Sequence, residues 1–250
     1  LLAGDLYDRS IPPPEAVRLF DSFLSRAVEA DPDLVVVAIP GNHDSAARLS
    51  FGTQIMSRAG LHIRTAPELC AEPVIVERGG ERAAIWPLPF LSAGAFGATP
   101  AESSEPAGGL RGQAELFAEA MGRILPRLEP KAHNVLLAHC FAAGGAASES
   151  ERAFVGAAEQ IDASPFAFFD YVALGHLHRF QGAGATGRYA GSPLAYSFAE
   201  GADVKGFVLV DLKAEGGFEA RLLPVAPLHV MRRIEGPFSV LASPGAFPEY

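Results

Sequence analysis

Val35-Val36-Val37-Ala38-Ile39-Pro40-Gly41-Asn42-His43-Asp44 is the stretch that decides the fold. Its first half is an unbroken apolar run, which predicts a strand covered on both faces, as in the parallel sheets of α/β proteins. Ligands of such sheets bind outside the carboxyl ends of the strands. Gly41 lets the backbone turn tightly at that point. We therefore expect this strand to deliver Asn42, His43 and Asp44 to a ligand-binding edge.

The residues before this strand predict a strand-helix-strand unit. Leu1 to Asp5 is typical of the tail of a buried strand that ends in a carboxylate. Glu15 to Ala30 carries apolar residues at nearly helical spacing and stops at Asp31-Pro32. A right-handed crossover with parallel strands is expected for such a unit. Asp5 would then lie at the same edge of the sheet as Asn42.

Two later apolar runs also end in histidines. Residues 134–139 end in His139, and residues 171–178 end in the pair His176 and His178. If the strand continues through the pair, the spacing of two points both rings to one side. Further expected elements are a helix at 46–58 with Leu49, Phe51, Ile55 and Met56 inside, short strands at 61–63, 73–76, 83–87 and 188–190, a surface excursion at 94–112, a helix at 113–128, and a hairpin of 206–212 and 218–225.

The composition restricts the class of protein. The chain has 250 residues, of which 49% are hydrophobic, so it can form one large domain with a small appendage. No apolar run is long enough to span a membrane and no secretory leader is visible, so we expect a cytoplasmic protein without a membrane partner. The two cysteines, Cys70 and Cys140, form no zinc or disulfide pattern and are expected to be buried.

The net charge of −9 argues against broad, nonspecific attraction to nucleic acid. It does not exclude an enzyme that acts on phosphate esters, because an acidic metal site brings its own positive ions. A basic groove with interleaved aromatic residues is not visible in the sequence.

The strand-end residues have the chemistry of a metal site. Carboxylate, amide and imidazole donors without thiolates suit a divalent ion such as manganese, iron or zinc. Two ions about 3.5–4 Å apart would share a carboxylate, activate a water and hold a phosphoryl group. Asp5 is the natural bridge, and one site would be completed by Asn42, His139 and His176 while His178 serves the other.

The two residues after Asn42 suggest catalytic roles. His43 could stabilise the phosphorus or protonate the leaving oxygen, because an imidazole carries a proton near neutral pH. Asp44 is placed to orient that imidazole. Arg48, one helical turn later, could bind a phosphate oxygen, with an exposed helix arginine as the simpler interpretation.

Each residue also has a plain structural interpretation. A strand-end Asp such as Asp5 is usually a turn former or helix cap, and a single His139 is more often a satisfied core histidine than a ligand. Their joint occurrence at the ends of several predicted strands favours the metal hypothesis over the structural one.

Gly4-Asp5, Gly41-Asn42-His43-Asp44, His139 and Gly175-His176-Leu177-His178 resemble the successive motifs of the calcineurin-like metallophosphoesterases. More narrowly, residues 1–14, 41–51, 148–152, 170–179 and 189–200 resemble the SbcD family of nuclease subunits of bacterial SbcCD complexes. The resemblance implies an α/β two-sheet sandwich flanked by helices. It assigns 1–228 to the phosphoesterase (nuclease) domain and 229–250 to the start of a small capping domain that helps to hold DNA.

The resemblance also implies an activity. The SbcD family is a two-metal, manganese-dependent group of DNA nucleases with 3′→5′ double-strand exonuclease and single-strand or hairpin endonuclease activity in DNA repair, recombination and replication. Its members form homodimers with an SbcC-type ATPase. By matching motifs, Asp5 would bridge the metals, Asn42, His139 and His176 would hold the second, His178 would bind the first, and His43 would be catalytic.

Two alternatives remain open at the sequence level. One is another hydrolase of the same fold, such as a cyclic-nucleotide phosphodiesterase or a phosphoprotein phosphatase. The other is a scaffold of the same fold without catalysis. Every metal ligand that the family pattern places within the span of this chain is present, which argues against the scaffold.

The chain departs from the family pattern in one major respect. The opening Asp-x-His motif, which the resemblance implies for the first metal, is absent. Because the chain starts within a strand, we expect this motif to lie upstream of Leu1 and the carboxyl end to be truncated too. The fragment alone is then expected to bind one metal better than the other and to be weakly active or inactive. Phe180 also replaces an expected proline.

Overall fold

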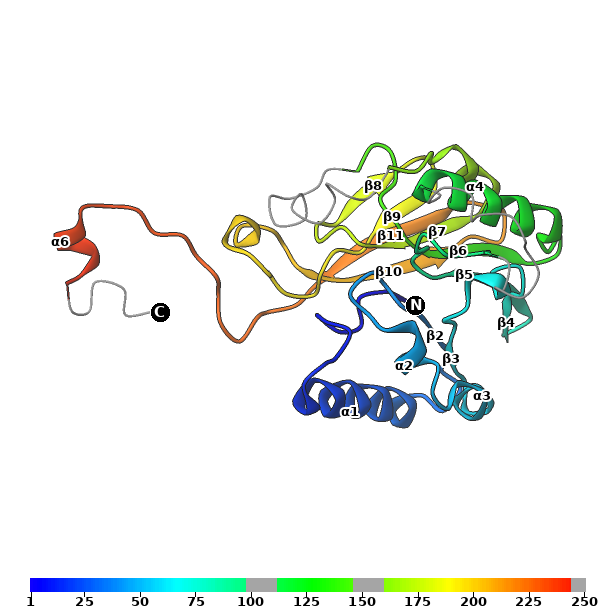
Figure 1. Ribbon diagram of the computed structural model, residues 1–250, viewed down its shortest axis with the longest axis horizontal. Coiled ribbons are helices and arrows are strands. Elements are labelled where there is room, and N and C mark those ends of the chain that lie inside the picture. Colours follow the sequence, from blue (N-terminus) through cyan, green and yellow to red (C-terminus); the bar gives the residue numbers. More distant parts are fainter. Residues whose placement is uncertain (98–111, 146–159, 244–250) are drawn as a thin grey trace, which may run out of the picture.

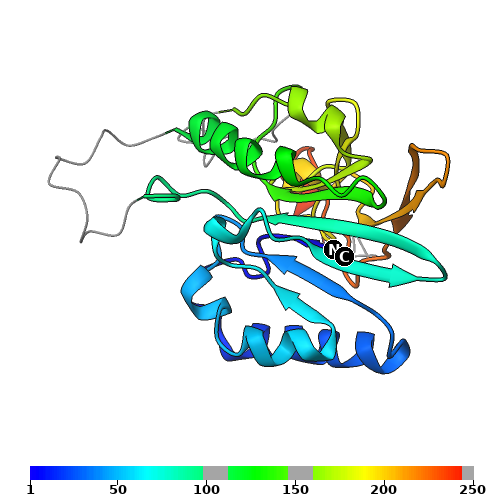
Figure 2. The same cartoon turned by 90° about the vertical axis from the view of Figure 1, so that its right-hand side faces the viewer.

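The computed structural model describes residues 1–97, 112–145 and 160–243. Two sheets lie face to face, with α1 (Pro14–Ala30) outside one and α4 (Gln113–Ile124) outside the other. Figure 2 shows these layers edge-on. The arrangement is the α/β two-sheet sandwich flanked by helices that the sequence predicted.

The first sheet contains the strand-helix-strand unit. β1 (Leu2–Ala3) pairs in parallel with β2 (Val36–Ile39), which pairs in parallel with β3 (Leu61–Ile63). All four residues of β2 are buried, which explains its unbroken apolar sequence. The helix α1 connects β1 to β2, and its Leu24 packs against the outer face of the sheet. The predicted unit is confirmed.

The second sheet has six strands in the order β4-β5-β6-β7-β9-β8. Its central strands are parallel, and β4 and β8 pair antiparallel at the edges. The strand bounds are β4 Val74–Arg78, β5 Glu81–Leu88, β6 His133–His139, β7 Tyr171–Gly175, β8 Gln181–Ala183 and β9 Gly187–Tyr189. The helix α4 covers the outer face with five buried residues, Leu116, Phe117, Ala120, Met121 and Ile124.

A separate apolar cluster fills the space between the sheets. Val37 and Ile39 of β2 pack there against Val135 and Leu137 of β6, together with Tyr171 of β7. The predicted hairpin is formed by β10 (Gly206–Leu212) and β11 (Phe218–Pro224), which pair antiparallel over their whole length. The ring of Phe218 lies 5.0 Å from that of Tyr171, so the hairpin closes one side of this inter-sheet core.

The predicted helix at 46–58 is broken into α2 (Ala46–Leu49) and α3 (Thr53–Met56). Gly52 lies between them with φ of +73°, a left-handed conformation that interrupts a helix. As a result, Phe51 and Ile55 are 87% and 75% exposed, and the prediction that they face inward was wrong. The short strand β8 was not predicted. Further short helices are η1 Ser57–Ala59, η2 Pro67–Leu69, η3 Leu125–Arg127, η4 Ser164–Phe168, η5 Phe198–Glu200 and α6 Phe238–Leu241.

After β11 the chain leaves the body of the molecule (Figure 1). Within 229–243 the only helix is α6, and Leu228 and Phe238 are 97% and 84% exposed. The assignment of 229–250 to a capping domain stays a prediction. The 148–152 stretch and most of the predicted excursion at 94–112 lie outside the described residues. None of the described helices is both long and apolar enough to cross a membrane.

Candidate metal centre

Four strand-end side chains from both sheets meet at one place. Asp5 follows β1, Asn42 follows β2, His139 ends β6 and His176 follows β7. The Oδ1 of Asn42 lies 3.0 Å from Nε2 of His139 and 3.1 Å from Nδ1 of His176. The Nε2 of His139 also lies 3.3 Å from Oδ2 of Asp5. The sequence predicted these four as one ligand set, and the structure brings them together.

These separations fit a common metal ion. For metal-ligand distances of about 2.1 Å, adjacent donors lie about 3.0 Å apart in an octahedron and about 3.4 Å apart in a tetrahedron. The three measured separations of 3.0 to 3.3 Å fall in this range. Among the described residues, no three His, Cys, Asp or Glu side chains form such a cage by themselves. The set therefore depends on the amide oxygen of Asn42.

Asp5 and His139 are held in the orientation that a ligand needs. The Nδ1 of His139 lies 2.7 Å from the carbonyl oxygen of Ala3, so this nitrogen carries the proton and Nε2 faces the site. The backbone N–H of His43 donates to Oδ1 of Asp5. Burial by itself raises the pKa of Asp5, but the hydrogen bond and charge of His139 and the His43 N–H outweigh it and lower that pKa to about 2. Asp5 is therefore ionised at neutral pH, as a carboxylate must be to bind a metal.

His176 is held in an unusual backbone conformation. Its φ is +100° and that of Asp5 is +50°, a region that non-glycine residues seldom occupy and that recurs at functional sites. The strand ends at Gly175, so the prediction that His176 and His178 continue it was wrong. Burial, aided by the nearby His139, lowers the pKa of His176 to about 4. The ring is thus neutral, as metal binding requires, and its buried Nε2 has no hydrogen-bond partner within the described residues.

Two glycines allow the strand ends to approach one another. A Cβ atom at Gly41 would lie 2.1 Å from Oδ1 of Asp5. A Cβ atom at Gly175 would lie 1.8 Å from the carbonyl oxygen of Ala3. Any side chain at either position would push the two sheets or the ligand loop apart, so both positions require glycine.

His178 lies on the same cleft but has a different set of contacts. A cleft of about 770 Å³ is lined by Asp5, His139, His176 and His178, among others. The Nδ1 of His178 lies 3.2 Å from Oε1 of Glu200. This pairing points to Nε2 as the nitrogen that would bind a metal, as is usual for ligands backed by a carboxylate. That His178 binds the other metal ion stays a prediction.

His43 and Asp44 have contacts other than the one that the sequence suggested, and the orienting role of Asp44 stays a prediction. The Nδ1 of His43 lies 2.9 Å from the carbonyl oxygen of Asp8, so Nε2 is the nitrogen that can face a substrate in the cleft. The Asp44 carboxylate accepts hydrogen bonds from the backbone N–H groups of Leu6, Tyr7 and Gly41. Asp44 therefore ties the loop after β2 to the loop after β1, and it is the Asp8 carbonyl that holds the His43 ring.

Arg48 agrees with its simpler interpretation as an exposed helix arginine, and Glu200 is a residue that the sequence did not single out. Arg48 is exposed on α2 and is not among the residues that line the cleft. Glu200, in contrast, was not predicted as a site residue, although it lies in a stretch that carried the family resemblance. Its proximity to His178 could not be read from local patterns, because the two residues are 22 positions apart.

Residues 1–180 match the family model of the calcineurin-like phosphoesterases. The chain belongs to that family. Its members generally use divalent metal ions, which agrees with the donor set of Asp5, Asn42, His139 and His176. The calcineurin-like phosphoesterase assignment also explains why the site lies at the carboxyl ends of strands from both sheets.

Two relatives of this calcineurin-like phosphoesterase are named as the SbcD component of the nuclease SbcCD. The protein from Staphylococcus epidermidis is 31% identical over 245 residues, which cover 95% of this chain and 62% of the relative. The protein from Staphylococcus saprophyticus subsp. saprophyticus is 29% identical over 242 residues, which cover 94% of this chain and 60% of the relative. The chain thus spans about three fifths of the length of these curated relatives.

Proposed function

We propose that this chain is the hydrolytic part of a metal-dependent DNA nuclease. The observation that carries the proposal is the cluster of four donor atoms, whose neighbouring members lie 3.0 to 3.3 Å apart. Three of the four residues, Asp5, His139 and His176, line the same cleft as His43. Metal ions there would lower the pKa of a bound water and neutralise the charge that develops on a phosphoryl group. The nuclease name of the two relatives supports DNA as the substrate.

The chain's own residues divide the work as follows. Asp5, Asn42, His139 and His176 would hold one ion, and Asp5 with His178 would contribute to a second. Nε2 of His43 is placed to donate a proton to the leaving oxygen of the phosphodiester, because its Nδ1 is already held by a carbonyl.

The finer features of the activity are also part of the proposal. We propose manganese as the ion, two ions per site, and both 3′→5′ exonuclease and endonuclease activity in DNA repair and recombination. The SbcCD name of the relatives supports an SbcC-type ATPase partner, and we propose a homodimer within that complex. The net charge of −9 implies that metal ions and the partner supply much of the attraction to DNA.

The test compares three substrates with and without Mn²⁺. We expect weak, Mn²⁺-dependent cleavage of a 3′-labelled duplex DNA and of a chromogenic phosphodiester, with still less cleavage of a phosphomonoester. Cleavage of monoesters or cyclic nucleotides without cleavage of DNA would instead indicate another phosphoesterase. Failure to bind Mn²⁺ in calorimetry would indicate a scaffold without catalysis.

A further inference from the structure

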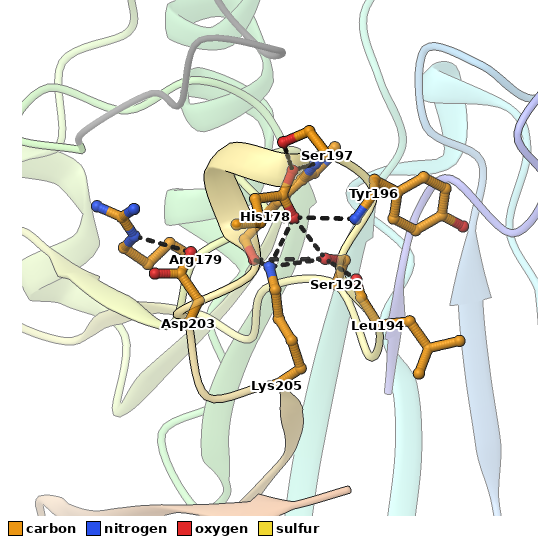
Figure 3. Close-up of polar contacts among 9 residues, drawn as sticks. His178, Arg179, Ser192, Leu194, Tyr196, Ser197, Asp203 and Lys205 are labelled. Atoms are coloured by element: carbon orange, nitrogen blue, oxygen red, sulfur yellow. Dashed lines mark hydrogen bonds and ion pairs between the residues drawn. The ribbon is translucent and has the colours of Figure 1, made fainter. Parts of the chain in front are cut away.

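A buried polar network lies next to His178 and includes Ser192, which also lines the cleft. Figure 3 shows His178, Ser192 and Lys205 converging on one point. At that point lies the carboxylate of Glu200, whose side chain is 1% exposed. A fully buried carboxylate is costly unless it is paired and hydrogen-bonded, so its contacts indicate what it does.

The two oxygen atoms of Glu200 have different partners. Oε1 lies 3.2 Å from Nδ1 of His178 and accepts a hydrogen bond of 3.1 Å from the hydroxyl of Ser197. Oε2 accepts a hydrogen bond of 2.7 Å from Nζ of Lys205 and one of 3.3 Å from the backbone N–H of Tyr196. One oxygen therefore faces the imidazole, and the other faces the ammonium group.

Lys205 keeps this carboxylate ionised. Its side chain is 7% exposed, and its Nζ donates to the carbonyl oxygen of His178 at 2.6 Å and to the hydroxyl of Ser192 at 3.0 Å, as well as to Glu200. Burial by itself raises the pKa of Glu200, but the hydrogen bonds from Lys205 and His178 lower it to about 2. The ammonium group thus holds the backbone of His178, while the carboxylate faces its ring.

The placement of Glu200 determines which ring nitrogen of His178 carries the proton, because Oε1 faces Nδ1 while Oε2 is paired with the ammonium group of Lys205. An ionised carboxylate can only accept a hydrogen bond, so Nδ1 must be the protonated nitrogen. In the neutral ring, Nε2 is then the nitrogen whose lone pair can bind a ligand. We propose that Glu200 is a positioning residue, which fixes the tautomer of His178 and so presents Nε2 to a metal ion in the cleft. This inference rests on the proposed function, in which His178 is a metal ligand.

The variant Glu200→Gln tests the tautomer directly. Lys205 can only donate, so the amide oxygen of the glutamine would turn to Lys205 and the NH₂ group would turn to His178. Nδ1 would then have to accept, and the proton would move to Nε2. The imidazole ¹⁵N shifts of the metal-free protein report this change, because protonated and unprotonated ring nitrogens resonate far apart.

We expect Nδ1–H in the unsubstituted protein and Nε2–H in Glu200→Gln. The Mn²⁺ dissociation constant of the site that includes His178 should rise by about 10–100-fold in this variant, the usual effect of losing the partner of a ligand. Lys205→Met removes the ammonium group that keeps the carboxylate ionised, so it should also weaken the preference for the Nδ1–H tautomer. Glu219→Gln, in an exposed pair with Lys213, is the matched control and should change neither readout.

An Nε2–H tautomer in the unsubstituted protein would overturn the inference without any variant, as would an unchanged tautomer in a folded Glu200→Gln protein. If the tautomer changes as expected but the unsubstituted protein binds no Mn²⁺, the positioning role of Glu200 is supported and the proposed function fails. The two proposals therefore fail separately.

Discussion

At the scale of single residues, His43 is held at Nδ1 and lies in the wall of the cleft. Its Nδ1 contacts the Asp8 carbonyl, and its ring faces the same cleft as Asp5 and His139. We expect His43→Ala to abolish hydrolysis and to leave Mn²⁺ affinity nearly unchanged, because the ring is not among the four donors. Turnover of the chromogenic diester and calorimetric titration measure the two effects. Loss of metal in this variant would make His43 a ligand, and His133→Ala is a control outside the site.

Asp44 is expected to act on stability. Its carboxylate accepts three backbone hydrogen bonds that join the loops after β1 and β2. Asp44→Ala leaves three N–H groups without this acceptor and should lower the free energy of unfolding by about 3 kcal/mol, at about 1 kcal/mol for each bond. Urea denaturation of the metal-free protein measures this loss. An unchanged midpoint together with impaired catalysis would restore the role of orienting His43.

At the scale of elements, β1 and β7 meet through Gly175. Its missing side chain leaves room for the carbonyl oxygen of Ala3, which in turn fixes the ring of His139. We expect Gly175→Ala to displace β1, to destabilise the fold by about 1–3 kcal/mol and to weaken Mn²⁺ binding. Thermal unfolding and metal titration measure these effects. Gly122→Ala is the matched control, because its Cβ would meet nothing within 4 Å and alanine favours a helix.

The elements that support the site could be predicted because their sequences are locally consistent. The unbroken apolar runs before Asn42 and His139 predicted buried parallel strands, and the ends of such strands meet at one edge. The break at Gly52 was missed because glycine is tolerated within a helix and its left-handed φ depends on the surroundings.

The partners of Asp44 and Glu200 could not be predicted. Asp44 bonds to backbone groups 37 and 38 residues away as well as to Gly41, and Glu200 lies 22 residues from His178. Tertiary packing alone decides where loop N–H groups point and which partners buried polar side chains meet. A motif can therefore give the type of residue at a site without giving the atom that it contacts.

At the scale of the whole molecule, Cys70 and Cys140 can report whether solvent reaches the core between the second sheet and α4. Both lie in the apolar cluster on the α4 side of the second sheet, and burial raises the pKa of Cys70 to about 11 and that of Cys140 to about 12. Because the thiolate is the reactive form, we expect negligible alkylation by iodoacetamide at pH 8 and increasing reaction only as the pH approaches 11. Mass spectrometry measures the labelling, and protein in denaturant is the positive control. Rapid labelling of the folded protein at pH 8 would show that this layer opens.

The ligands of the candidate centre are far apart in the chain. His139 contacts Asn42 across 97 residues and Ala3 across 136, and His176 contacts Asn42 across 134. Contacts of such long sequence separation form late in folding because a long loop must close first. A chain still emerging from the ribosome cannot assemble the four donors until β7 has been made and both sheets have met. The nascent protein therefore lacks the complete donor set, which forms only when this region has been synthesised and has folded.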